Sequence, residues 1–416
     1  MQEEQGAPDP SIGERIKRHR RRRGLSQTAL AQLVGRSESW LSQVERGIRG
    51  VDRFSTILEL AKVLKVDVVE LTGRRFQLAP NGGMHYEAVV KIRKALTQYD
   101  AIPALLLSEG ARRRAEAPPD LDRLRRNVGE ANRQYQASRY VLVGELLPDL
   151  IVLAQRAVRE LDGSQQQRAY GMLAEVYHVT AKTLSRVGEA GLAWVVAERA
   201  VVAAERSEAP VLMAASAYHL GQAFLRAGQL DDTSSVAVGT AELLERDRRN
   251  LTPERLSAVG ALYLTAAIAA ARDSDRGRAE QLLARATRHA ETIQDGLNHL
   301  WFAFGRLNIA IHRVAVAVEL GDPRAAIRHG EAVDLARLPQ ELRGRRSQLL
   351  VDLARGYAQQ RMDAAAVNTL LDAEQEAPEA IRFNALVHET VRELLRREHQ
   401  RSTPQLRGLA HRLRVL

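Results

Sequence analysis

The chain has 416 residues and a formal net charge of +10, so it is long for one compact core and favours two or three folding units. Hydrophobic residues make up 45% of it but aromatic residues only 4%, a balance that suits helix-on-helix packing and predicts an all-α protein. The absence of cysteine excludes disulfides, thiolate zinc sites and cysteine nucleophiles, and agrees with a reducing cytoplasm.

The basic balance, with a pI near 10.1, favours a polyanionic partner. A GC-rich genome would also produce an excess of Arg and Ala, so charge alone does not identify that partner. Residues 1–11 lack the charged and apolar regions of a signal peptide, and we expect a short disordered lead-in. The longest apolar stretch, Ala258 to Ala271, is shorter than the roughly 20 residues of a membrane span. We therefore expect a cytoplasmic, nucleoid-associated protein with no membrane partner.

Helix start and stop signals are clear in residues 12–73. Ser26 and Ser37 are natural N-caps, and Gly24, Gly35 and Gly47 are natural helix ends. These signals predict five short helices, at about 12–22, 26–34, 37–46, 53–64 and 68–71. The second and third are joined by a short turn around Gly35, which is the arrangement of a helix-turn-helix.

The stretch LSQTALAQLVGRSESWLSQVERG, Leu25 to Gly47, resembles the helix-turn-helix of the XRE/Cro family of phage and bacterial repressors. Val51 to Gly73 also resembles the fourth and fifth helices of that family. The resemblance covers about a sixth of the chain. It implies a lambda-repressor-like five-helix domain that binds double-stranded DNA over residues 12–73.

In such a domain the start of the second helix meets a phosphate and the third helix enters the major groove. Glu38 would accept from a cytosine or merely favour the helix dipole, and Trp40 would touch the DNA or cover the junction between helices two and three. The run Arg20 to Arg23 is expected to be a solvated face from which Arg22 reaches a phosphate. The predicted DNA-binding residues are Gln27, Ser37, Glu38, Ser39, Trp40, Gln43, Arg46, Arg49 and Arg53.

Residues 74–83 break the helical periodicity and predict a linker, which leaves 84–416 as one helical domain. Small residues recur there at positions that open the second helix of a pair: Ala193, Thr233, Ala279, Ala326 and Ala366. A spacing of 40 to 47 residues is typical of a solenoid of helical hairpins. The repeats are similar to the tetratricopeptide pattern, although they are longer and degenerate, so we expect a TPR-like α-solenoid.

The segment 298–319 predicts one helix that carries a packing stripe and, on another face, a polar and aromatic stripe with Trp301, Asn308 and His312. First helices of such pairs line the concave face. Together with Arg226 and Arg355 from neighbouring repeats, these side chains predict a site for a peptide or small-molecule effector. The alternative is a hydrated groove or a hydrogen-bond network between repeats.

No P-loop, dinucleotide fingerprint, HExxH or GxSxG motif is present, so we expect no catalytic residues, no metal site, no cofactor and no enzyme activity. One small helix-turn-helix reads few base pairs, and we expect a homodimer on an inverted-repeat operator. The sequence thus predicts a ligand-responsive DNA-binding transcription regulator. The competing interpretation is a DNA-localised scaffold whose solenoid docks a partner protein.

Overall fold

The computed structural model describes residues 11–51, 54–66, 70–71, 83–97, 119–247, 252–294, 296–398 and 403–416. Within these ranges the protein is helical and contains no strand, which confirms the all-α prediction. The first helices along the chain are α1 (Ile12–Arg22), α2 (Gln27–Leu33), α3 (Glu38–Glu45), α4 (Phe54–Leu64), α6 (Gly83–Leu96), α8 (Leu121–Gln136) and α9 (Tyr140–Glu160). Arg53 and residues 74–82 of the expected linker lie outside the described residues.

The helices that follow are α10 (Gly163–Arg186), α11 (Ala190–Arg206), α12 (Pro210–Ala227), α13 (Leu230–Arg246), α14 (Pro253–Arg272), α15 (Arg276–Glu291), α16 (Arg306–Glu319), α17 (Pro323–Glu331), α18 (Arg343–Gln359), α19 (Asp363–Glu376), α20 (Pro378–Arg382), α21 (Ala385–Arg396) and α22 (Leu406–Arg412). Short 3-10 turns lie at His299–Trp301 and Leu335–Arg337.

Helices α1 to α4 pack around a small core of their own. Ile16, Leu30, Leu41 and Leu60 are fully buried in it. The Ser26 and Ser37 hydroxyls cap α2 and α3 by accepting from the backbone N–H of Ala29 and Trp40, at 3.0 and 3.1 Å. Gly35 ends α2 with a φ of +61°, which a residue with a Cβ adopts only at a cost. These local signals place α2 and α3 across a tight turn, as the sequence predicts.

The rest of the chain repeats a pair of antiparallel helices. The first helices of successive pairs, α10, α12, α14, α16 and α18, contact one another in order and form an inner layer. The second helix of each pair holds its small residue at the fourth position, fully buried: Ala193, Thr233, Ala279, Ala326 and Ala366. A small side chain at that point lets the two helices approach closely, so the predicted repeat is confirmed.

Helix α14 contains the most apolar stretch of the chain. It is enclosed by α12, α13, α15 and α16, and nearly every residue from Ser257 to Ala271 is buried. No helix in the described part of the chain is long and apolar enough to cross a membrane.

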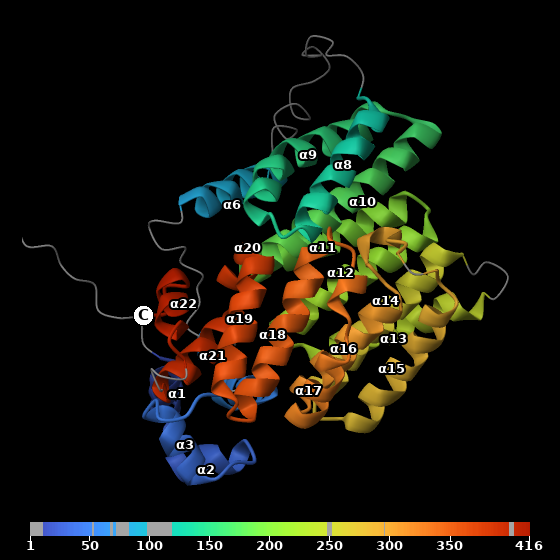
Figure 1. Cartoon of the computed structure of the whole chain (residues 1–416). Helices are drawn as coiled ribbons and strands as arrows, with labels where there is room; N and C mark the ends of the chain where they lie inside the picture. The colour runs from blue at the N-terminus through green and yellow to red at the C-terminus, as the bar shows by residue number, and fades with distance from the viewer. Residues whose placement is uncertain are drawn as a thin grey trace, which may run out of the picture.

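The superhelix closes on itself. Near the start of α9 the N–H of Val141 donates to Glu379 of α20 at 2.9 Å, and the Tyr140 and Phe383 rings lie 6.5 Å apart. Figure 1 shows α20 next to the lower ends of α9 and α10. Tyr140, Ala377, Ala380 and Phe383 form a separate hydrophobic cluster, which we call the seam. The first and last helices of the array are therefore in contact.

The segment before α16 differs from the prediction of one helix over 298–319. Helix α16 begins only at Arg306, and Leu300, Trp301 and Ala303 have positive φ values of 53°, 61° and 49°. The cause is packing against α14: a Cβ on Gly260 would lie 1.9 Å from Cζ of Phe304. Because the chain bends to seat Phe304 there, Trp301 does not share a helical stripe with Asn308 and His312, and that prediction is wrong.

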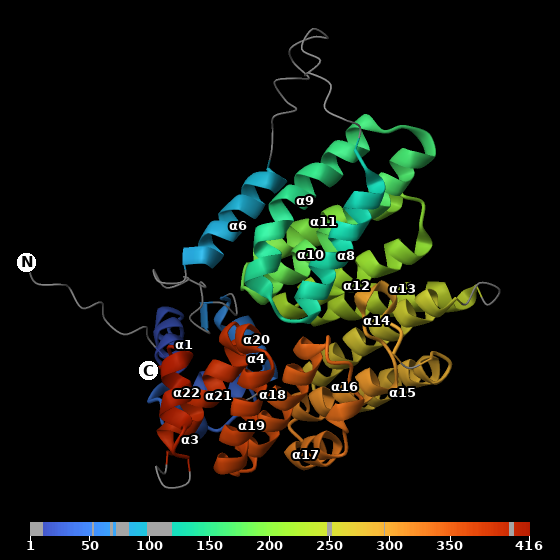
Figure 2. The same ribbon diagram turned by 45° about the horizontal axis from the view of Figure 1, so that its top comes forward.

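The N-terminal helices also touch the far end of the chain. The N–H of Gly50 donates to the Glu393 carboxylate of α21 at 2.8 Å. Figures 1 and 2 both place α1 beside α21 and α22. Helices α1 to α4, which we call the head, and the last helices of the solenoid are thus neighbours in space.

Candidate DNA interface and effector site

Helix α3 presents polar side chains at its N-terminal half. Ser37, Glu38 and Ser39 are exposed, and Gln43 one turn later is partly exposed. The Gln43 amide makes no hydrogen bond within the described residues, so its donor and acceptor are available. Glu38 is held differently, since its carboxylate accepts from the Thr28 hydroxyl at 2.8 Å and ties α3 to α2.

A buried polar network lies behind this surface. Arg20 donates to Glu45 through Nε at 2.5 Å and through Nη2 at 2.8 Å, and its Nη1 donates to the Leu25 carbonyl at 2.7 Å. Arg20 is 8% exposed, so the expectation of a solvated face from Arg20 to Arg23 is wrong for this residue. The hydrogen bonds with Glu45 raise the pKa of Arg20.

Gln27 joins the same network. Its Nε2 donates to Glu45 at 2.7 Å, so one of its two amide hydrogens is used inside the protein. From the sequence, Gln27 was predicted to donate a hydrogen bond to a DNA phosphate, and Glu45 was assigned no part in the site. In the structure Glu45 links α1, α2 and α3 and fixes the angle at which α3 is presented.

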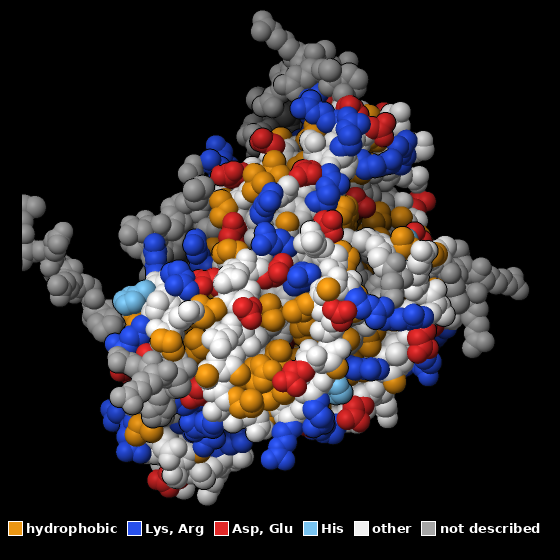
Figure 3. Space-filling model, viewed as in Figure 1, with side chains coloured by type: hydrophobic (Ala, Val, Ile, Leu, Met, Phe, Trp, Pro, Cys, Tyr) orange, Lys and Arg blue, Asp and Glu red, His pale blue; other side chains and the backbone are white. Residues whose placement is uncertain are grey.

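Trp40 is buried, at 8% exposure, in the core of the head. The Arg36 guanidinium carbon lies 5.6 Å from the centre of its ring. Arg46 and Arg49 are exposed just after α3, and Arg46 Nε donates to the Ser42 carbonyl at 3.3 Å. Figure 3 shows Lys and Arg side chains along the lower rim of the molecule, where Figure 1 places the head.

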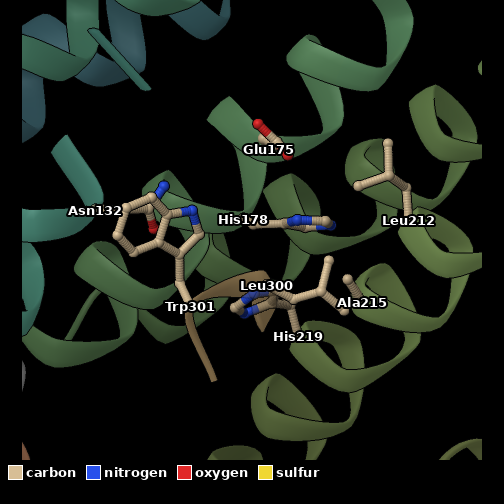
Figure 4. Close-up of a pocket in the computed structure, with 8 residues that line it drawn as sticks. All are labelled: Asn132, Glu175, His178, Leu212, Ala215, His219, Leu300 and Trp301. Carbon is tan, nitrogen blue, oxygen red and sulfur yellow. The ribbon is translucent and has the colours of Figure 1, made fainter. Parts of the chain in front are cut away.

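The inner layer of the solenoid is lined by polar side chains. His178, Lys182 and Arg186 follow at four-residue intervals on α10 and therefore share one face. The His178 ring stacks on His219 of α12 at 4.6 Å. In Figure 4 these two rings lie between Trp301 on one side of a small pocket and Leu212 on the other. Burial lowers the pKa of His178 to about 3, so its ring carries no charge near neutral pH.

Asn308, His312 and Arg355 lie elsewhere on the same layer. Asn308 is 4% exposed and its Oδ1 has no hydrogen-bond partner in the described residues. His312 contacts the Asn308 carbonyl through Nδ1 at 2.8 Å, and burial together with Arg345 lowers its pKa to about 4. Arg355 is already paired, because its Nη1 lies 3.2 Å from both Glu319 and Asp352.

The five predicted effector residues are thus not gathered in one pocket. Trp301 lines the pocket with His178 and His219, and Arg226 lies in the last turn of α12. Sequence reasoning missed Lys182 and Arg186. The four-residue spacing of His178, Lys182 and Arg186 could have identified them, because it places the three side chains on one helical face. The same kind of spacing was the basis of the prediction for residues 298–312.

A family model described as a helix-turn-helix domain matches residues 11–72. The HTH-type transcriptional regulator SinR of Bacillus subtilis (strain 168) is 30% identical over 86 residues, which are 21% of this chain and 78% of SinR.

Two solved structures align with much of the chain at low identity. Bacillus thuringiensis PlcR, in complex with the peptide PapR7 and DNA, aligns over 68% of this chain and 94% of its own, with 15% identity and a TM-score of 0.31. A Rap protein complexed with competence and sporulation factor aligns over 89% of this chain and 99% of its own, with 12% identity and a TM-score of 0.47. On the N-terminal match to SinR and the fold of α1 to α4, the chain belongs to the family of helix-turn-helix transcriptional regulators.

Proposed function

We propose that the chain is a sequence-specific DNA-binding regulator in which residues 12–73 read an operator and residues 84–416 dimerise and sense a peptide or small-molecule effector. The observation that carries the first half is the free amide of Gln43 beside the exposed Ser37 and Ser39 on α3. Exposed polar side chains on the second helix of a helix-turn-helix are placed to meet base edges in the major groove.

The remaining predicted contacts divide by role. The N-terminus of α2, with the second amide hydrogen of Gln27, meets one phosphate, and Arg46 and Arg49 meet others. Glu38 both reads a base and holds α2 through Thr28. Trp40, because it is buried, acts by fixing α3 in place, and Arg53 is a further phosphate contact by position in the sequence.

The test begins with selection of genomic fragments that the purified full chain binds, followed by titration of the best fragment and of random DNA. Gln43→Ala should cost about 1 to 3 kcal/mol on the selected site and relax specificity at one base position. Arg46→Ala should weaken binding to both DNAs alike and lower the salt slope by about one. Equal losses on both DNAs for Gln43→Ala would show that this side chain is not a base reader.

The effector half of the proposal is supported by Asn308, whose buried Oδ1 lacks a partner while its neighbour His312 is kept neutral. An effector that donates a hydrogen bond there, and reaches Trp301, Arg226 or the Arg355 ion pair, would prefer one curvature of the solenoid. Asn308→Ala should leave folding and effector-free DNA binding intact and abolish the effector's influence on the operator. A pull-down that recovers one stoichiometric protein, with no small effector, would favour the scaffold instead.

A homodimer is the second part of this proposal. Two heads on an inverted repeat would supply the specificity that one head lacks, with half-sites about 34 Å or a multiple apart. Val195 and Val202 on α11 are exposed and offer apolar surface to a second copy. Light scattering should give a dimer at micromolar concentration; a monomer that stays monomeric on DNA would contradict it.

A further inference from the structure

Four cations of the inner layer have no acidic partner. Lys182 and Arg186 belong to α10, Arg226 to α12 and Arg345 to α18. Within the described residues none of the four forms an ion pair, whereas Arg272 and Arg355 of the same layer do. We call these four side chains the cation cluster.

Lys182 is the most enclosed member. Its ammonium donates to Asn132 Oδ1 at 2.6 Å and lies 4.4 Å from the centre of the Tyr135 ring. Burial, and next the charge of Arg345, lowers the pKa of Lys182 to about 7. The ammonium therefore carries its charge at a cost that Asn132 and the Tyr135 ring offset only in part, and no carboxylate pairs with it in the described residues.

The three guanidinium groups surround the same region. The Arg186 guanidinium carbon is 5.6 Å from the centre of the Tyr140 ring, and its buried Nε makes no hydrogen bond. Arg226 is exposed and lies close enough to Arg186 for the two charges to repel each other. Arg345 donates one hydrogen bond, from Nη2 to the Phe302 carbonyl at 3.2 Å.

Two other cations of the inner layer are neutralised from within the protein. Arg272 lies 3.7 Å from Glu319, and Arg355 lies 3.2 Å from both Glu319 and Asp352. The fold thus supplies carboxylates to Arg272 and Arg355 and supplies none to the cation cluster. An acceptor from outside the protein is what the cluster lacks.

A simpler explanation is that these cations stabilise helix C-termini. That explanation fits Arg186 and Arg226, which lie in the last turns of α10 and α12. It fails for Arg345, because this residue is in the first turn of α18, where the helix dipole disfavours a cation. It also leaves Lys182, a full turn inside α10, unexplained.

We propose that the cation cluster binds an anionic group, a carboxylate or a phosphate, of the molecule that the solenoid senses, so that the effector is an acid. Guanidinium groups pair with such anions in bidentate geometry, and an enclosed site strengthens each pair. This inference rests on the proposed sensing function and adds the chemical class of the ligand. It assigns the charged end of the ligand to residues of α10, α12 and α18.

The test uses the full chain and two probes, inorganic phosphate and succinate, titrated by calorimetry at constant ionic strength set with chloride. Arg226→Gln is the main variant, since this side chain is exposed and makes no hydrogen bond in the described residues; Lys182→Gln is the second. Arg313→Gln on α16 and Arg278→Gln on α15, both exposed changes, are the matched controls. Thermal unfolding checks that each variant folds.

At least one probe should bind the wild type and both controls alike and bind Arg226→Gln and Lys182→Gln at least about tenfold more weakly. Preference for succinate identifies a carboxylate site and preference for phosphate a phosphate site. Absence of binding by either probe, or equal dissociation constants in the cluster variants and the wild type, overturns the proposal.

Proton uptake gives an independent readout. A bound anion favours the charged form of Lys182, so binding above pH 7 should take up a proton and weaken as the pH rises through about 7. The groups that face Lys182 are Asn132 and Tyr135 of α8, His178 of α10, His219 of α12 and Arg345 of α18. Burial keeps the pKa of His178 and His219 below this range. Binding heats that are the same in buffers of different ionisation enthalpy would contradict the assignment to Lys182.

The outcome is separable from the fate of the proposed function. If the probe binds the cluster but leaves operator affinity unchanged, the anion site stands and ligand-responsive regulation fails. If an effector controls DNA binding with the same affinity in Arg226→Gln as in the wild type, regulation stands and the anion site is wrong.

Discussion

Glu45 is the residue on which the polar interior of the head depends. Its carboxylate accepts two hydrogen bonds from Arg20 and one from Gln27, and it is 3% exposed. A buried ion pair contributes little net stability, yet loss of one partner leaves the other charge without compensation. Glu45 therefore matters most when it is removed.

We expect Glu45→Ala to destabilise the head by about 3 to 5 kcal/mol, because Arg20 is left buried and unpaired. Urea unfolding followed by Trp40 fluorescence, in a background with Trp194 and Trp301 replaced by Phe, measures the change. Glu59→Ala, an exposed acid on α4, is the control and should stay within about 0.5 kcal/mol of the parent. Equal stability of the two variants would show that the Arg20–Glu45 ion pair does not stabilise the head.

The burial of Arg20 was within reach of the sequence. Ile12, Ile16 and Arg20 follow at four-residue intervals, so Arg20 continues the apolar face of α1. Residue type alone does not distinguish the buried Arg20 from the three exposed arginines that follow it. Its position on the helical face does. The partner, Glu45, was not predictable in the same way because 25 residues and two helix ends separate it from Arg20.

Buried histidines make the solenoid sensitive to acid. Burial lowers the pKa of His178 to about 3 and that of His312 to about 4, against an unfolded value near 6.5. The unfolded chain binds protons first as the pH falls below about 6.5, so stability should be lost by up to about 1.4 kcal/mol per pH unit and histidine until the folded pKa is reached.

His178→Gln should therefore reduce the fall in melting temperature between pH 7.5 and pH 5, since one of these protonations is removed. The exposed His411 supplies the control, because His411→Gln leaves both buried rings in place. Parallel pH profiles for the wild type and His178→Gln would show that this ring does not couple folding to protons.

At the scale of whole helices, the sequence predicts starts and ends well where the cause is local. Caps such as Ser26 and Ser37 and the small residues at the fourth position of each second helix act through near neighbours. The segment 298–305 failed because its cause is distant. It is shaped by Gly260 on α14 and by Gln136 of α8, whose side-chain amide donates to the Trp301 carbonyl at 3.1 Å.

Gly260→Ala tests that cause. The added Cβ would lie 1.9 to 2.5 Å from three ring carbons of Phe304, so ring and segment must move, at a cost of about 1 to 3 kcal/mol. Gly239→Ala on α13 meets nothing within 4 Å and should instead stabilise by up to about 1 kcal/mol. Thermal unfolding of both variants measures whether stability falls in Gly260→Ala and rises in Gly239→Ala. A Gly260→Ala protein as stable as the wild type would mean that Phe304 does not hold the bend.

At the scale of the molecule, a repeat of 40 to 47 residues predicts a superhelix but not whether it closes. Closure depends on residues far apart in the chain, such as Val141 and Glu379. It also determines the surroundings of the cation cluster, because Tyr140 belongs to the seam and contacts Arg186. The sequence predicted several polar residues of the inner layer. It did not predict the contact between the first and last helices, which determines the surroundings of their charged groups.

Phe383→Ala is the variant that separates closure from the rest of the fold. It removes the ring that lies 6.5 Å from Tyr140 and empties part of the seam, which should cost about 3 to 5 kcal/mol if the structure does not relax. Closure brings together elements whose own hairpins remain intact, so we expect the ring to open before the helices melt. Small-angle X-ray scattering should then show a larger radius of gyration with helical content retained. Anion binding should weaken too, although no charge has changed, because Tyr140 no longer supports Arg186. Leu243→Ala, an exposed change on α13, should alter neither quantity. An unchanged radius and unchanged anion affinity in Phe383→Ala would show that the seam neither closes the ring nor shapes the site.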